Sequence, residues 1–228
     1  MRATLRRFLA GTSPVSAARR LMTTPLGHDP AVWRRMADEL GLPGLAVPEE
    51  HGGAGGGVRD LAVVMEELGR SLVCGPFLAS AVLAVHALLA SGDERARREL
   101  LPGLAEGAVI GTLAVAEESG SWEPEAVTMT AGPGHRLDGV KSFVLDGHVA
   151  GLVLVAARTP AGLSLFAVDG DAPGLTRVPL PVLDRTRRLA RLEFAGVPAR
   201  LVGREGAGAR AVAHALDVGA VALAAEQL

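Results

Sequence analysis

Apolar residues in the first hundred positions recur at intervals of three and four, which is the spacing of one helix face. The clearest stripe consists of Val58, Leu61, Ala62, Met65, Leu68 and Leu72. Residues 30–40 show the same spacing, and we expect Trp33, Met36 and Leu40 to point inward. Both stretches are therefore predicted to be amphipathic helices.

Two further helices are expected before residue 108. Gly75-Pro76 ends the first stripe and opens an apolar run over residues 77–90, which predicts a buried helix with His86 as a core residue. Asp93 is suited to be an N-cap. The helix behind it would carry Leu100, Leu101 and Leu104 inward.

Strand-like runs replace the helical pattern near Val109. Short apolar and β-branched runs cover residues 109–115, 127–131, 140–145, 152–157, 163–168, 175–178 and 189–194. Gly, Pro and Asp turns separate them, which is typical of an antiparallel sheet or barrel. From Glu205 the helical pattern returns and continues to Leu228.

Helices, then strands, then one helix predict an α+β fold or two packed subdomains. Without a partner, the terminal helix would expose a set of apolar side chains, Val212, Leu216, Val218 and Leu223. We therefore expect a further helical domain or a second subunit to cover this helix.

Composition excludes several classes of protein. Lys and Arg number 23 against 25 Asp and Glu, so the chain lacks the basic excess of a nucleic-acid surface. Cys74 is the only cysteine, which excludes a disulfide or a Cys-based zinc site within one chain and fits a cytoplasmic protein. Residues 1–10 have no signal-peptide core. The apolar run over residues 77–90 is too short to span a membrane.

Residues 138–148 form the most informative stretch, Asp-Gly-Val-Lys-Ser-Phe-Val-Leu-Asp-Gly-His. Two Asp-Gly turn signals bracket an aromatic and β-branched run, which predicts a short strand between tight turns. Alternate residues of a strand share a face. Lys141, Phe143 and Leu145 are therefore expected on one face, and Ser142 and Val144 on the other.

Four segments, in order along the chain, resemble the acyl-CoA dehydrogenase family. Residues 40–57 contain its Val-Pro-Glu step and Gly-rich loop, and residues 111–122 stand where the family has Thr-Glu-Pro-x-x-Gly-Ser-Asp. Residues 138–148 are similar to its flavin-facing strand, Gly-x-Lys-x-Trp-Ile-Thr-Asn-Gly. Residues 183–208 resemble the end of its second domain. Together the four segments cover nearly the whole chain.

The resemblance implies a helical N-terminal domain at residues 1–108, an antiparallel β-barrel middle domain at 109–204 and the start of a C-terminal helical domain at 205–228. It implies an FAD-dependent enzyme of fatty acid and lipid metabolism that dehydrogenates acyl-CoA thioesters. A carboxylate base would remove the α-proton, and the flavin would accept a hydride from the β-carbon. Electron-transfer flavoprotein and further subunits of a homo- or hetero-oligomer are the implied partners.

The resemblance carries the flavin contacts to two groups of positions, Val115, Ala116 and Ser121, and Phe143, Val144 and Leu145. Two of them depart from the family pattern, because Ala116 and Leu145 stand where the family has a threonine hydroxyl. The family's base lies beyond Leu228, so no catalytic residue is assigned and the chain is expected to be truncated in its C-terminal domain. An alternative is a catalytically silent partner subunit of a heteromeric acyl-CoA dehydrogenase.

Other chemistry has weaker support. Gly52 to Gly57 lacks the spacing and the Lys-Ser/Thr of a phosphate loop. Gly206-Ala-Gly208 opens a predicted helix that continues to Leu228, so it lacks the following strand that would end in an acidic residue about 20 residues on, as a dinucleotide site requires. The six histidines show no metal-ligand spacing. Glu117 and Glu118 are expected in a solvated turn. Arg185 to Arg188 could bind cofactor phosphates or form structural ion pairs.

Overall fold

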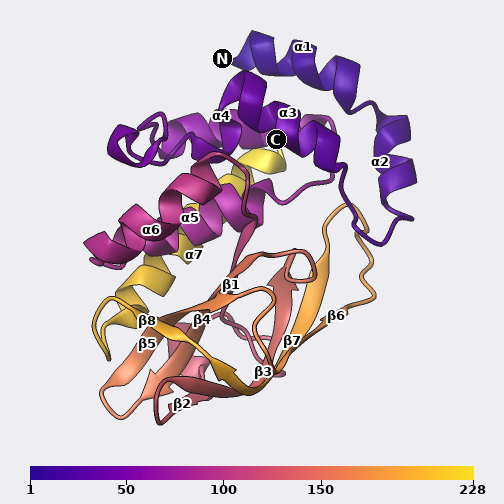
Figure 1. Cartoon of the computed structure of the whole chain (residues 1–228). Coiled ribbons are helices and arrows are strands. Elements are labelled where there is room, and N and C mark those ends of the chain that lie inside the picture. Colours follow the sequence, from indigo (N-terminus) through magenta and orange to yellow (C-terminus); the bar gives the residue numbers. More distant parts are fainter.

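The helices of the first half form one block in the computed structural model, which describes residues 1–228 (Figure 1). They are α1 (Arg2–Thr12), α2 (Val15–Leu21), α3 (Pro30–Leu40), α4 (Val58–Arg70), α5 (Val85–Ala90) and α6 (Glu94–Ala105). Single 3₁₀ turns lie at Leu42–Gly44 and Glu49–His51. The predicted helices at 30–40, at 58–72 and after Asp93 are confirmed, whereas α1 and α2 were not predicted.

Local capping explains where two of these helices begin. Asp29 Oδ1 accepts a hydrogen bond from the Ala31 N–H at 2.9 Å. Asp93 Oδ1 likewise accepts from the Ala96 N–H at 2.9 Å. Each carboxylate satisfies one of the unpaired donors that a helix N-terminus leaves free.

The apolar run at residues 77–90 is helical, but its first part is wider than an α-helix. Leu78–Ala84 form a π-helix (η3), and α5 continues from it. All side chains from Leu78 to Leu88 are buried. A π-turn within a buried helix often occurs at a functional site, and Leu78 lines the cavity described below.

Eight strands make one sheet below the helices (Figure 1). They are β1 (Gly111–Ala114), β2 (Thr130–Gly132), β3 (Arg136–Leu145), β4 (Leu152–Thr159), β5 (Gly162–Asp169), β6 (Leu175–Pro179), β7 (Leu189–Pro198) and β8 (Arg200–Val202). Their order is β6-β7-β3-β2-β4-β5-β8, with β1 beside β4.

The sheet corrects one prediction about the architecture. β4 pairs in parallel with β1 and with β2, while the other pairs are antiparallel. A parallel pair needs a long connection, and the stretch from residue 115 to 151 supplies it between β1 and β4. The end strands β6 and β8 do not pair, so the sheet is not closed and the predicted antiparallel barrel is not confirmed. The mixed α+β class is confirmed.

Strand β3 is longer and less regular than predicted. Asp138-Gly139 lies inside the strand, where the register with β7 shifts, and is not a turn. A second shift lies between Lys141 and Val144, and Phe143 there has φ 57°. An inserted residue breaks the alternation of faces. Lys141, Ser142, Val144 and Leu145 are all buried and Phe143 is exposed, so the predicted alternation is wrong.

The last helix, α7 (Gly208–Glu226), packs on the N-terminal helices (Figure 1). Val212 and Val218 are buried, so helices of the same chain supply part of the cover that the apolar face of α7 was expected to need. The close approach of α7 to α4 depends on Gly69 of α4, because a Cβ at this position would lie 2.0 Å from the Glu226 carbonyl oxygen. By length and composition alone α7 could cross a membrane, and 44% of its 18-residue apolar window is buried within the protein. The bounds of the three predicted domains stay a prediction.

Candidate functional site

The two segments predicted to face a flavin lie side by side. The Ser142 N–H on β3 donates to the Ala116 carbonyl oxygen at 2.9 Å. The ring of Phe143 lies near Gly120, since a Cβ placed on Gly120 would be 3.6 Å from Phe143 Cε2. The chain after β1 is therefore held against the bulged part of β3.

A buried ion pair joins these segments from inside. Lys141 Nζ is fully enclosed and donates to the Val115 carbonyl oxygen and to Glu117 Oε1, both at 2.9 Å. Glu117 Oε1 also accepts from the Thr128 N–H at 3.1 Å and the Met129 N–H at 2.9 Å. Glu117 is thus a largely buried anchor with 14% of its side chain accessible, and the predicted solvated turn is wrong for it. Glu118, 74% exposed and paired with Arg191, does face solvent.

Burial and hydrogen bonding act in opposite directions on this pair. Burial alone would raise the pKa of the Glu117 carboxyl, but hydrogen bonds from Thr128, Lys141 and Met129 outweigh it and hold that pKa at about 2. Burial lowers the pKa of Lys141, and the bond to Glu117 opposes that change. The attraction between the Glu117 carboxylate and the Lys141 ammonium group therefore holds the chain after β1 against β3.

Of the six predicted flavin-contact residues, Phe143 alone has an exposed side chain, with 37% of its surface accessible. Ser121 is half-buried. The other four, Val115, Ala116, Val144 and Leu145, are buried. These four can meet a ligand on the surface chiefly through backbone atoms. Their role as flavin contacts stays a prediction.

The backbone beside Phe143 has unused donors. The N–H groups of residues 116–119 donate no hydrogen bond within the chain. Ala116 is 1% exposed, and a buried N–H without a partner is rare in proteins. An aromatic face next to such donors fits the planar, acceptor-edged ring system of a flavin. A flavin would be held by the Phe143 ring and by the backbone of Val115, Ala116 and residues 117–119.

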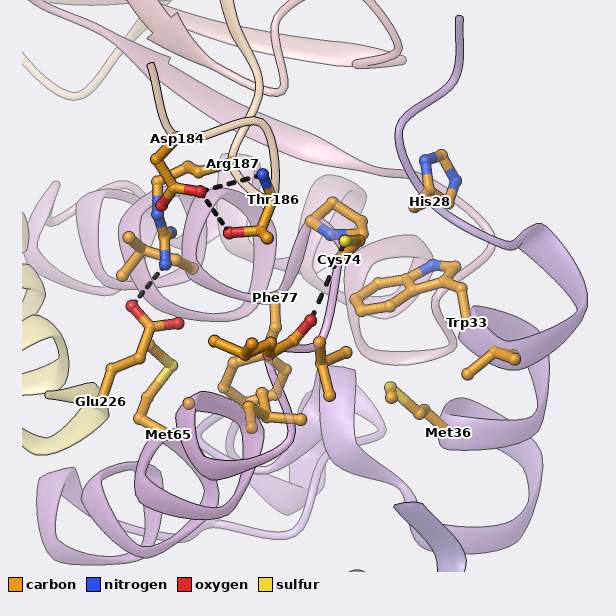
Figure 2. A pocket seen from close by; sticks show the side chains of 18 of the residues that line it. His28, Trp33, Met36, Met65, Cys74, Phe77, Asp184, Thr186, Arg187 and Glu226 are labelled. Atoms are coloured by element: carbon orange, nitrogen blue, oxygen red, sulfur yellow. Dashed lines mark hydrogen bonds and ion pairs between the residues drawn. The ribbon is translucent and has the colours of Figure 1, made fainter. Parts of the chain in front are cut away.

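A cavity of about 310 Å³ lies where the helical block meets the loop before β7 (Figure 2). Its walls come from α3, α4, the start of η3 and the end of α7. The apolar lining includes Trp33, Met36, Met65, Leu68, Phe77 and Leu78. Pockets of this size and character bind small ligands.

The polar residues on one side of the cavity bind one another (Figure 2). Arg187 pairs with Glu226 of α7. Asp184 Oδ1 accepts from the Thr186 N–H at 2.9 Å and from its hydroxyl at 2.6 Å. These contacts join the loop to α7 and leave few free charges facing the cavity.

Two titratable groups close to the cavity are shifted toward their neutral forms. Burial raises the pKa of the Cys74 thiol, so it is a weak nucleophile. Burial also raises the pKa of the Asp146 carboxyl to about 7, against the opposing charges of Arg187 and Arg188. Asp146 immediately follows β3, so this carboxyl titrates near neutral pH at the end of that strand.

The arginine cluster of residues 185–188 has a structural role at two positions. Arg187 forms the ion pair with Glu226. Arg188 Nη2 donates to the carbonyl oxygens of Met22 at 2.9 Å and Thr24 at 2.8 Å. The structure therefore favours structural contacts over phosphate binding for these two side chains.

Histidines are not grouped for metal binding, and no set of three His, Cys, Asp or Glu side chains is placed to hold an ion. His86 is buried as expected, but it is not fully satisfied. Its Nδ1 lies 3.3 Å from His214 Nε2, and its own Nε2 has no partner.

The cavity was missed at the level of sequence because its lining comes from four separated stretches of the chain, residues 28–36, 65–78, 184–187 and 223–227. Nothing in the local pattern around His28, Cys74 or Arg187 indicates that they meet. Lys141 and Glu117 had a local signal, a lysine inside an apolar strand and a carboxylate after another strand. The sequence can suggest that each of these two residues is unusual, but only the fold shows that they bind each other.

Comparison with known proteins gives the family. The profile described as "Acyl-CoA dehydrogenase, N-terminal domain" matches residues 1–108. "Acyl-CoA dehydrogenase IpdE2" of Mycolicibacterium smegmatis is 36% identical over 212 residues, which cover 93% of this chain and 53% of that protein. The chain thus spans about half the length of this curated relative.

Solved structures agree over almost the whole chain. A variant of the "Tcur3481-Tcur3483 steroid ACAD" has a TM-score of 0.84 and 33% identity, covering 99% of this chain and 61% of that one. The ChsE4-ChsE5 complex of Mycobacterium tuberculosis gives 0.83 and 28%, with the same coverage of 99% and 61%. Four ordered motifs and these likenesses lead to one conclusion: the chain belongs to the acyl-CoA dehydrogenase family of flavoprotein oxidoreductases.

Proposed function

We propose that this chain carries the flavin-facing strand and the acyl cavity of an enzyme that dehydrogenates acyl-CoA thioesters. The reaction removes a proton from the α-carbon and a hydride from the β-carbon of the thioester, which leaves an α,β-double bond. FAD, when bound, supplies the hydride acceptor. The observation that carries the proposal is the bulge of β3, which exposes Phe143 beside the free N–H groups of residues 116–119.

The residues of this chain would position the cofactor and exclude water. Phe143 offers an aromatic face, and the buried Lys141–Glu117 pair holds the neighbouring segment at a fixed distance from β3. Donors fixed before a ligand arrives cost no reorganisation on binding. The low exposure of Val144 and Leu145 keeps water from the inner side of the strand.

The cavity of about 310 Å³ suits the acyl part of the substrate. Its walls are mostly apolar, and burying an acyl chain is favoured by roughly 0.8 kcal/mol for each methylene group. Two methionines, Met36 and Met65, give adaptable walls. The name of one similar structure contains the word "steroid", so a ring-bearing acyl group is a candidate among acyl-CoA substrates.

A second candidate function is that of a partner subunit in a heteromeric dehydrogenase. Two observations favour it: Ala116 and Leu145 lack the hydroxyl groups expected at the flavin, and one similar structure is a complex of two different proteins. Each lost hydrogen bond would weaken flavin binding by about 1 kcal/mol. A complete subunit would then supply the base, and electron-transfer flavoprotein would accept the electrons.

The proposal is tested by purifying the chain in its native assembly and measuring bound FAD by absorbance. We expect FAD to co-purify, and its absorbance to bleach when acyl-CoA thioesters are added without oxygen. An assembly that contains this chain but no flavin would contradict the proposal. Stoichiometric FAD with full turnover in the isolated chain would exclude the partner-subunit alternative.

A further inference from the structure

One buried polar side chain in the cavity has a hydrogen-bonding atom without a partner. His28 lies between α2 and α3, is 7% exposed and lines the cavity on the side of Trp33, opposite Arg187 and Glu226 (Figure 2). Its Nδ1 lies 3.2 Å from the Leu26 carbonyl oxygen. No group of the chain bonds to its Nε2.

The contact with Leu26 determines which nitrogen of the His28 ring carries the proton. A carbonyl oxygen can only accept, so Nδ1 must be the donor. Burial lowers the pKa of His28, which keeps the ring neutral near pH 7. In a neutral imidazole the other nitrogen is an acceptor. His28 Nε2 therefore offers a lone pair to whatever occupies the cavity.

The position of this ring is fixed by the segment around it. The Leu26 carbonyl oxygen also accepts from His148 Nε2 at 3.0 Å. Asp29, the next residue, caps α3. Arg188 holds the backbone on the other side through the carbonyl oxygens of Met22 and Thr24. A side chain fixed in this way loses little entropy when it binds a ligand.

Three other polar residues of the lining, Trp33, Arg187 and Thr186, have partners of their own. Trp33 Nε1 donates to the Gly107 carbonyl oxygen at 3.0 Å. Arg187 and Thr186, on the far side, are paired with Glu226 and Asp184. His28 Nε2 is accessible within the cavity. An apolar ligand that covered it would remove it from water and leave it without a partner, and an unpaired buried polar atom costs about 1–3 kcal/mol.

We propose that His28 selects acyl groups that carry a hydroxyl, which donates to His28 Nε2 from within the cavity. A hydroxyl is the donor that fits best, because burying an ammonium group would cost far more and a carboxylate has no proton to give. His28 is thus a specificity-determining residue. The inference rests on the proposed function, which places the acyl group in this cavity.

Calorimetric binding to the purified chain tests this inference without any flavin or turnover. The probes are a medium-chain acyl thioester of N-acetylcysteamine and its singly hydroxylated derivatives, each with the hydroxyl on a different distal carbon. We expect at least one derivative to bind about three- to tenfold more tightly than the parent thioester. Equal or weaker binding by every derivative would overturn the inference.

Two variants separate the hydroxyl contact from a general effect on the cavity. His28→Phe keeps a flat ring without the acceptor and should abolish the preference while the parent thioester still binds. His28→Gln supplies an amide oxygen and should restore part of the preference. A preference that persists in His28→Phe would refute the assignment. If the parent thioester does not bind the native chain at all, the acyl cavity of the proposed function fails together with the inference.

Discussion

Fully buried ionic groups in this chain are satisfied by several partners each. Glu67 on α4 is 0% exposed and binds Arg6 and Arg2 of α1 as well as Arg70. Lys141 is equally buried and binds Glu117 and a carbonyl oxygen. A buried charge is tolerated only when it is paired and hydrogen-bonded. Residue type alone predicts exposure for these side chains, so their burial could not be predicted from the sequence.

Lys141→Met should destabilise the fold through the charge it leaves behind. Glu117 would keep its bonds from Thr128 and Met129 but lose its cation, and removing one member of a buried pair costs about 3–5 kcal/mol. Urea denaturation measures this loss. In the double variant Lys141→Met/Glu117→Gln we expect at least half of it to be recovered. Additive losses in the double variant would show that the two residues do not act as a pair.

Regular elements were predictable where their sequence signals are local. The stripe at 58–72 and the N-cap Asp93 predicted α4 and α6 because helix periodicity and capping involve neighbours in the chain. The shape of β3 was not predictable, since its bulges depend on the register with β7. β8 was missed as well, because its three residues pair only with β5.

The β3 bulge gives a prediction about Phe143. Its φ of 57° is unfavourable for an aromatic residue and favourable for glycine. Phe143→Gly should therefore change the free energy of unfolding by less than about 1 kcal/mol, while removing the aromatic face for FAD. We expect bound FAD per chain to fall severalfold in the native assembly. Val178→Ala, at another exposed apolar residue of the sheet, should leave FAD unchanged. Unchanged FAD content in Phe143→Gly would contradict the flavin contact.

The packing of α5 on α7 gives a prediction about pH. Burial, aided by the neighbouring His214, lowers the pKa of His86 from 6.5 to about 4. Between these values the unfolded chain binds a proton that the folded chain excludes, so the free energy of unfolding falls as the pH decreases from 6.5 toward 4. His86 should contribute about 2 kcal/mol to that fall by pH 5, because each pH unit is worth about 1.4 kcal/mol.

Urea denaturation at pH 7 and pH 5 measures this effect. In His86→Phe the fall should be smaller by about 2 kcal/mol, and the remainder includes His28 and His148, whose pKa values burial also lowers. His135→Gln, in the turn between β2 and β3, serves as the matched control and should keep the full fall. If His86→Phe and the unmodified chain show the same pH dependence, the fall in the free energy of unfolding does not come from His86.

At the scale of the whole molecule, the order of helices and strands could be read from the sequence, but the contacts between them could not. The apolar face of α7 indicated that something must cover it. That cover comes partly from α4 and α5, which precede it by more than a hundred residues. The cavity likewise could not be read from the sequence, because its lining forms only when the loop before β7 meets the helical block.

Arg188 connects the two halves of the molecule and gives the last prediction. Its Nη2 donates to the carbonyl oxygens of Leu21, Met22 and Thr24, and Gly27 leaves room for it, because a Cβ there would lie 2.6 Å from Arg188 Cγ. Arg188→Met removes these charge-assisted bonds, each worth about 1.5–3 kcal/mol. Amide hydrogen exchange in α2 and up to residue 28 should become about 10- to 100-fold faster.

The rest of the helical block supplies the internal control for that experiment. α1 is held by ion pairs of Arg2 and Arg6 with Glu66 and Glu67, so its exchange should not change. Arg185→Met, at an exposed residue of the same loop, should leave α2 unaffected. Faster exchange throughout the helical block would indicate global destabilisation. Faster exchange confined to α2 and the loop before α3 would show that Arg188 fastens this segment, and with it His28, to the sheet.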